Sequence, residues 1–130
     1  MVAIALALIA GACDGLAYLA LDGLFVANQT GNTVLLGLAI ARGDGFATVE
    51  YVIALAAFIF GLAAAALLIE RLTRSGVTRM LPAVLMVEAL LIAVGALIIE
   101  LAGGRLSGGT SELLAGAALA TAMGMQTSAL

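Results

Sequence analysis

Histidine, lysine and tryptophan are absent from this sequence of 130 residues, which has a single cysteine and a single proline. Because histidine and cysteine supply the usual zinc ligands, a metal site of that kind is excluded, and no cofactor is expected. Cys13 has no second cysteine with which to form an intrachain disulfide. A serine or threonine nucleophile would have no histidine base. The protein is therefore not expected to be an enzyme.

Charged residues are also scarce. They make up 10% of the chain, whereas soluble domains contain about 25%. The net charge is −3, and the only basic residues are five arginines scattered along the sequence. A nucleic-acid surface needs clustered basic side chains, so no nucleic-acid partner is expected.

Apolar residues make up 65% of the chain, against about 45–50% in soluble proteins. They occur in several long runs, and a helix that crosses a bilayer needs about 20 apolar residues. The sequence therefore predicts an all-α fold, a polytopic transmembrane helical bundle in a lipid bilayer. We expect a single membrane domain, residues 1–130, with helical segments at about residues 2–27, 33–42, 51–69, 81–102 and 113–130.

A polar stretch separates the first two apolar runs. Residues 28–33 read NQTGNT, six consecutive polar or glycine residues. Gly31 permits a non-helical backbone, and Asn32 is a good N-cap for a helix that starts at Thr33. The run that follows, residues 33–42, is only about 15 Å long as a helix, half of a crossing. The sequence predicts a broken helix or a tight helical hairpin at residues 28–33, and an extramembrane turn between two helices stays open as the alternative.

The arginines indicate an orientation. Three of the five fall in one short loop, residues 71–80: Arg71, Arg74 and Arg79. Short loops rich in arginine face the cytoplasm, so this loop is expected on that side. The loops at residues 43–50 and 103–112 are then expected on the outer side. Residues 1–42 make either one net crossing or two.

Two acidic residues, Asp14 and Glu88, lie inside predicted spans. Insertion scales assign a cost of roughly 2.5–3.5 kcal/mol to Asp at a helix centre. No arginine or lysine occurs within any predicted span. Three roles stay open for each acid: neutral hydrogen bonding, carrying a proton, or binding a cation or cationic substrate. An aspartyl-type catalytic pair, which would need the two carboxyl groups about 3 Å apart, is the weakest reading.

Small residues recur at four-residue spacing, which places each series on one helix face and lets a neighbouring backbone approach closely. The series are Gly11 and Gly15; Ala57, Gly61 and Ala65; and Gly116, Ala120, Gly124 and Ser128. We therefore expect a closely packed bundle.

Residues 11–44, GACDGLAYLALDGLFVANQTGNTVLLGLAIARGD, resemble the signature of the YoaK family. The matching residues are Asp14, Phe25, Thr30, Gly31, Asn32, Thr33, Gly37, Gly43 and Asp44. Glu88 begins a segment similar to the family's Glu-Ala-Leu-Leu. The final AMGMQTSAL resembles its Ala-Met-Gly-x-Gln-Asn segment, with Thr127 in place of Asn. The family consists of uncharacterised bacterial inner-membrane proteins with a domain of unknown function. The resemblance implies a multi-pass helical protein of that membrane and supplies no substrate.

The chain departs from the family pattern at both ends. Members usually begin with a basic cytoplasmic N-terminus and continue beyond the glutamine segment into another Thr-Gly motif and a final helix. This chain begins in its hydrophobic run and stops at Leu130. We therefore expect a truncated member or a fragment, in which a site shared between two Thr-Gly segments would be incomplete in one copy. A homo-oligomer is left open.

Together these features predict a small-solute transporter or permease-like protein with an intramembrane polar site, acting on a solute or ion that the sequence does not identify. The residues expected to bind the solute are Asn28, Thr30, Gly31, Asn32, Thr33 and Gln126. Asp14 and Glu88 are expected to couple transport to a proton or a cation. The alternative is a structural or regulatory membrane protein, in which the buried polar residues join helices through hydrogen bonds that average about 0.6 kcal/mol.

Overall fold

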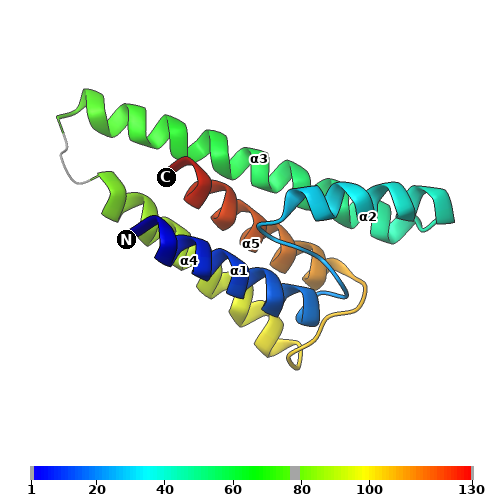
Figure 1. The fold of residues 1–130 in the computed structure, drawn as a ribbon. Coiled ribbons are helices and arrows are strands. Elements are labelled where there is room, and N and C mark those ends of the chain that lie inside the picture. Colours follow the sequence, from blue (N-terminus) through cyan, green and yellow to red (C-terminus); the bar gives the residue numbers. More distant parts are fainter. Residues whose placement is uncertain (1, 77–79, 130) are drawn as a thin grey trace.

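The computed structural model describes residues 2–76 and 80–129 and shows a bundle of helices (Figure 1). Within these residues the helices are α1 (Val2–Ala20), α2 (Gln29–Arg42), α3 (Gly45–Arg74), α4 (Met80–Leu101) and α5 (Thr110–Ala129). The described part of the chain contains no strand beyond one isolated bridge between Leu21 and Leu106. The predicted all-α bundle is confirmed.

The centre of the bundle is α5. Figure 1 shows it between α3 on one side and α4 and α1 on the other. It packs most extensively against α3 and next against α4, while α3 and α4 barely touch each other. Its inward-facing residues Ala115, Ala120 and Met123 are buried, whereas large apolar side chains elsewhere, such as Phe60 and Met86, stand exposed. Outward apolar side chains suit contact with lipid tails.

Three helices in the described ranges are long and apolar enough to cross a membrane: Ala3–Ala20 of α1, Gly45–Arg74 as the whole of α3, and Leu81–Leu101 of α4. The prediction also counted residues 113–130 as a span, and the helix found in that range is α5 (Thr110–Ala129). Although α5 is 20 residues long, it is not among these helices, because Glu112, Gln126 and its serine and threonine residues lower its mean hydropathy. Its neighbours shield it, so it needs a less apolar surface than they do.

Residues 2–42 connect one end of the bundle to the other. In Figure 1 the start of α1, the end of α3 and the end of α5 lie at one end, and the junction of α2 with α3 lies at the other. This course from one end to the other is the one expected for a single net crossing, and the number of membrane crossings stays a prediction. Arg79, one of the three arginines used for orientation, lies outside the described residues, and the cytoplasmic side of the bundle stays a prediction.

The interruption between α1 and α2 differs from the predicted one in position. Residues 21–28 are non-helical, whereas the predicted break at 28–33 is largely the first turn of α2. The N-cap is Asn28, whose side chain accepts a hydrogen bond from the Gly31 amide, and Asn32 is inside the helix. The earlier end of α1 follows from the left-handed backbone of Asp22 and Gly23, with φ of 44° and 98°.

The other helices are longer than or close to their predicted ranges. The prediction for α3 covered only residues 51–69, the uninterrupted apolar run. Asp44 caps the helix, with its side chain accepting from the Ala47 amide, so that α3 begins at Gly45. Because the cap lies ahead of the apolar run, an additional six residues become helical, Glu50 among them.

Glycines allow the backbones of α3 and α5 to touch. A Cβ atom added at Gly61 would collide with the backbone carbonyl of Thr121, and one added at Gly124 with that of Phe58. Ser128 reinforces the contact by donating a hydrogen bond to the Leu62 carbonyl over 2.7 Å. The predicted close approach of small residues is thus confirmed for these two helices.

Gly124→Ala should therefore lower the free energy of unfolding. The added methyl group has no space between two backbones, and overpacking of this kind costs about 1–3 kcal/mol. Gly15→Ala is the matched control, because nothing lies within 4 Å of its added Cβ. Unfolding of both variants in mixed detergent micelles measures the difference, and equal stability of the two would contradict the proposed α3–α5 contact.

Candidate functional site

The non-helical segment, residues 21–28, is held by a side chain from the middle of α1. Asp14 Oδ1 accepts hydrogen bonds from the backbone amides of Val26 and Ala27, both over 2.7 Å. Val26 is fully buried. Hydrocarbon offers no partner to an unpaired amide, so a non-helical backbone needs such internal acceptors. Asp14 therefore supplies the hydrogen-bond acceptor that the carbonyl groups of a further helical turn would supply to these two amides.

Asn32 binds the same segment from the other side. It is fully buried; its Oδ1 accepts from the Phe25 amide over 3.1 Å, and its Nδ2 donates to the Phe25 carbonyl over 2.6 Å. The Gln29 side chain donates to the Val26 carbonyl over 3.0 Å and accepts from Asn32 over 3.0 Å. The side chains of Asn32 and Gln29 thus form hydrogen bonds with the backbone of residues 25–26, as a neighbouring β-strand would.

Five of the six predicted solute-binding residues, all except Gln126, are thus brought together around residues 21–28, and most of these five have structural partners. Asn28 caps α2, and Thr33 Oγ1 donates to the Gln29 carbonyl over 2.9 Å. Gly31 lies beneath the Phe25 ring, where an added Cβ would come within 2.8 Å of a ring carbon. Thr30 is exposed. Solute binding by this group stays a prediction.

Glu88 and Gln126 lie elsewhere, on α4 and α5. Each is only 4% exposed, and in the described chain neither Glu88 Oε2 nor Gln126 Nε2 has a hydrogen-bond partner. Asp14 and Glu88 both lie near enough to Cys13 to act on its thiol electrostatically. No hydrogen bond within residues 2–76 and 80–129 joins Gln126 to Asn32. Glu88 thus keeps the unpaired oxygen that a proton or cation carrier needs.

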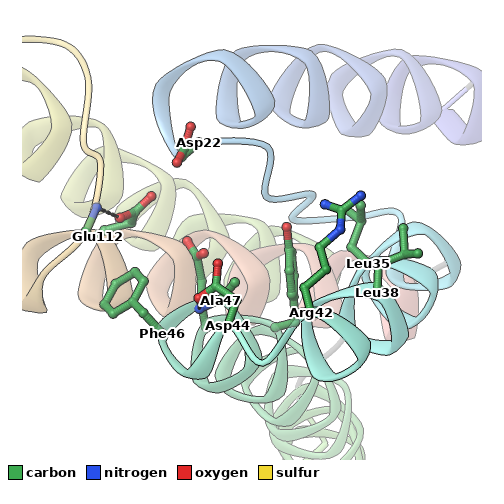
Figure 2. A pocket seen from close by; sticks show the side chains of 12 residues that line it. Asp22, Leu35, Leu38, Arg42, Asp44, Phe46, Ala47 and Glu112 are labelled. Carbon is green, nitrogen blue, oxygen red and sulfur yellow. Dashed lines mark hydrogen bonds between the residues drawn. The ribbon is translucent and has the colours of Figure 1, made fainter.

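A cavity of about 200 Å³ lies at the end of the bundle where α2 meets α3. Figure 2 shows its walls: Asp22 from the non-helical residues 21–28, Arg42 from the end of α2, Asp44 and Phe46 at the start of α3, and Glu112 at the start of α5. Its lining residues are Asp22, Leu35, Leu38, Ala39, Arg42, Asp44, Phe46, Ala47, Glu50, Tyr51, Gly108 and Glu112. We refer to it as the acid cavity.

Two buried carboxyl groups, those of Glu50 and Glu112, meet in the acid cavity. Glu50 is 5% and Glu112 1% exposed. Both side chains line this one cavity, close enough for the two carboxyl groups to interact electrostatically. Glu112 Oε2 also accepts from the Gly108 amide, the dashed line in Figure 2. As carboxylates, Glu50 Oε1 and Glu112 Oε1 have no partner.

The acid pair has no basic partner. The only ion pair among the described residues joins Glu70 to Arg74 on the exposed end of α3. Arg42 lines the acid cavity but makes no ion pair there. Two buried carboxyl groups that share a cavity repel each other when both are ionised, which favours a proton on one of them or a cation between them.

The acid cavity was not predicted from the sequence. Glu50 fell in the predicted loop 43–50 and Glu112 in the predicted loop 103–112, where acidic residues are ordinarily solvated. One signal was present: Glu70 has an arginine four residues later on its helix, whereas neither Glu50 nor Glu112 has a basic residue three or four positions away. An acid without such a neighbour on its own helix can be paired only with a residue from elsewhere in the fold.

Comparison with known proteins gives a consistent picture. A family model described as "Protein of unknown function (DUF1275)" matches residues 2–130. The UPF0700 transmembrane protein YoaK of Bacillus subtilis (strain 168) is 42% identical over 66 residues, which make up 51% of this chain and 29% of the relative. The aligned part thus covers less than two thirds of that relative. No solved structure matches the chain. The resemblance seen in residues 11–44 is confirmed, and the chain is a membrane protein.

Asp14→Ala should destabilise the protein, because it leaves the amides of Val26 and Ala27 without acceptors. An unsatisfied buried donor costs about 1–3 kcal/mol, so a loss of about 2–6 kcal/mol is expected for the two together. Asp14→Asn keeps a side-chain oxygen and should lose less. Glu100→Ala, which removes an exposed acid from α4, is the control.

Unfolding in detergent gives the free energies, and hydrogen exchange of the Val26 and Ala27 amides locates the effect. If Asp14→Ala matched the wild type in stability and in the exchange rates of both amides, the structural role assigned to Asp14 would be wrong.

Proposed function

We propose that this chain, which belongs to the DUF1275 family of proteins of unknown function, is a small-solute transporter or permease-like protein of the bacterial inner membrane. Its solute site is the acid cavity. The observation that carries the proposal is that two buried carboxyl groups, those of Glu50 and Glu112, line one cavity and have no basic partner among the described residues.

Such a pair lowers the stability of the fold unless something compensates it. Burying a carboxylate without a partner is expensive, and two in contact also repel each other. A structural role would be served as well by neutral or apolar side chains of similar size, with no repulsion to overcome. Sites where buried acids face each other across a cavity are typical of binding and proton transfer. The acid cavity therefore supports a functional role better than a structural one.

Unpaired polar groups also lie farther along the bundle. Glu112 is in the first turn of α5, and Gln126, with its unpaired Nε2, is near the other end of that helix. Fourteen residues of helix separate them, which is about 21 Å. Glu88 on the neighbouring α4 has an unpaired oxygen as well. This distribution supports a route along α5 from the acid cavity into the bundle, with Glu88 as the coupling residue.

Non-helical chain borders the acid cavity. Asp22 belongs to residues 21–28, and Gly108 belongs to the connection between α4 and α5. The two segments are tied together, because the Leu106 amide donates to the Ala20 carbonyl over 2.7 Å. Segments of this kind can change conformation without unwinding a helix, which is what opening and closing of a site require.

The second candidate function is a structural or regulatory membrane protein. The bonds of Asp14, Asn32 and Gln29 to the backbone of residues 25–27 favour it, because they show intramembrane polar residues that act as internal supports. In that case the acid pair would be an incidental feature of the packing between α3 and α5.

Transport can be measured with the protein reconstituted in liposomes on a solid-supported membrane, where charge movement is recorded during solute jumps. We expect a solute-dependent current in the wild type and a reduction of about tenfold or more in Glu50→Gln and in Glu112→Gln, since each loses a charged hydrogen-bonding group. Glu100→Gln, an exposed acid, should keep the wild-type current.

The solute panel contains amines, guanidines, amino acids, carboxylates and alkali cations. Currents that Glu50→Gln and Glu112→Gln leave unchanged would remove the acid cavity from the transport route. If no solute gave a current while the liposomes contained correctly folded protein, the structural or regulatory function would replace the transport function.

A further inference from the structure

We propose that the acid cavity binds a small monovalent organic cation, with an ammonium or guanidinium group placed between the carboxyl groups of Glu50 and Glu112. The inference rests on the proposed function for the location of the solute. It adds the chemical class of that solute, and it concerns binding, which can be measured without transport.

The charge of the lining selects a cation. Four of the lining residues are acidic and one is basic. Asp44 Oδ1 is engaged by the Ala47 amide at the start of α3, over 3.0 Å. Glu50 and Glu112 each retain an oxygen without any partner, and both side chains are more than nine-tenths buried. An anion placed here would meet these oxygens directly, whereas a cation would satisfy them.

The number of donors favours an organic cation over a metal ion. An ammonium group offers three N–H donors and a guanidinium group five, enough to bridge two carboxyl groups. Calcium takes six to eight oxygen ligands, and magnesium requires a near-octahedral set. Two buried carboxyl groups do not supply that number. The described residues contain no group of three or more His, Cys, Asp and Glu side chains placed to hold a metal ion.

The remaining wall of the acid cavity suits a short apolar body attached to the charge. Leu35, Leu38 and Phe46 line it together with the ring of Tyr51, a buried residue. Aromatic faces attract cations, and leucine side chains pack against methylene groups. The volume, about 200 Å³, is below the range of about 300–1,000 Å³ typical of sites for drug-sized ligands. A solute of a few carbon atoms therefore fits better than a large one.

Arg42 provides a test of whether the solute is a cation or an anion. Its guanidinium is the only positive charge in the lining, and Figure 2 shows it near Leu35, across the view from Glu112. For a cationic solute this charge is repulsive, so Arg42→Gln should strengthen binding. For an anionic solute Arg42 would be the main attraction, and the same variant should weaken binding.

The experiment is calorimetric titration of the full chain in lipid nanodiscs. The probes are propylammonium chloride and methylguanidinium chloride, with sodium propionate, calcium chloride and magnesium chloride for comparison. We expect saturable binding of at least one organic cation. Its Kd should rise about tenfold or more in Glu50→Gln and in Glu112→Gln, fall in Arg42→Gln, and stay unchanged in Glu100→Gln.

Circular dichroism and thermal unfolding of each variant confirm that it is folded before titration. Because two separate glutamate variants are used, the test still holds if one of them fails to fold. The inference is overturned if neither organic cation binds, if calcium, magnesium or propionate binds in preference, or if the two glutamine substitutions leave Kd unchanged. Cation binding without any current would reject the transport function and keep this inference. A current that depends on Glu50 and Glu112, without cation binding, would reject this inference and keep the transport function.

Discussion

A chain in hydrocarbon has no solvent to pair with its backbone, and the arrangement at the α1–α2 junction depends on that constraint. Residues 25–27 leave the helix, and their polar groups are satisfied by Asp14 from one side and by Asn32 and Gln29 from the other. The polar run that follows, residues 28–33, thus supplies side chains that form hydrogen bonds with the backbone of the apolar residues before it. Without these bonds, α1 and α2 would have to join as a continuous helix or separate outside the membrane.

That junction also shapes the acid cavity. Ending α1 at Ala20 frees Asp22 to line the cavity and brings Leu21 beside Leu106 of the α4–α5 connection. The packing of α3 against α5 completes the cavity, because each helix contributes a buried acid to its lining, Glu50 and Glu112. The polar supports and the unpaired acids therefore have different roles. The first make an irregular backbone possible, and the second remain available to a ligand.

Much of the fold was predictable because long apolar runs have few alternatives in a bilayer. The ranges 81–102 and Met80–Leu101 differ by a single residue at each end. The break was detected but misplaced, because Asn28 to Thr33 were read as the broken part. A polar side chain can form hydrogen bonds with backbone groups several residues earlier in the chain, as Asn32 does with Phe25. The local sequence pattern does not reveal which backbone groups such a side chain will bind.

The acid cavity could not be predicted for a different reason. Glu50 and Glu112 are 62 positions apart, and no periodicity relates residues on different helices. Gly61 and Gly124 let α3 and α5 approach closely, and the same two helices bring Glu50 and Glu112 to one cavity. The small-residue series predicted that some pair of helices would touch. Which acids this would bring together depends on the register of the two helices, and only the folded chain fixes it.

The length of α3 links the acid cavity to the thickness of the membrane. Its 30 residues extend about 45 Å, while the hydrocarbon layer is about 30 Å thick. Such a mismatch is relieved by tilting the helix or by leaving its ends outside the hydrocarbon. Glu50 and Arg71 are about 32 Å apart along the axis, so anchoring of Arg71 at one headgroup layer puts Glu50 near the other. A thicker bilayer would draw the acid pair into the hydrocarbon, and a thinner one would leave it hydrated.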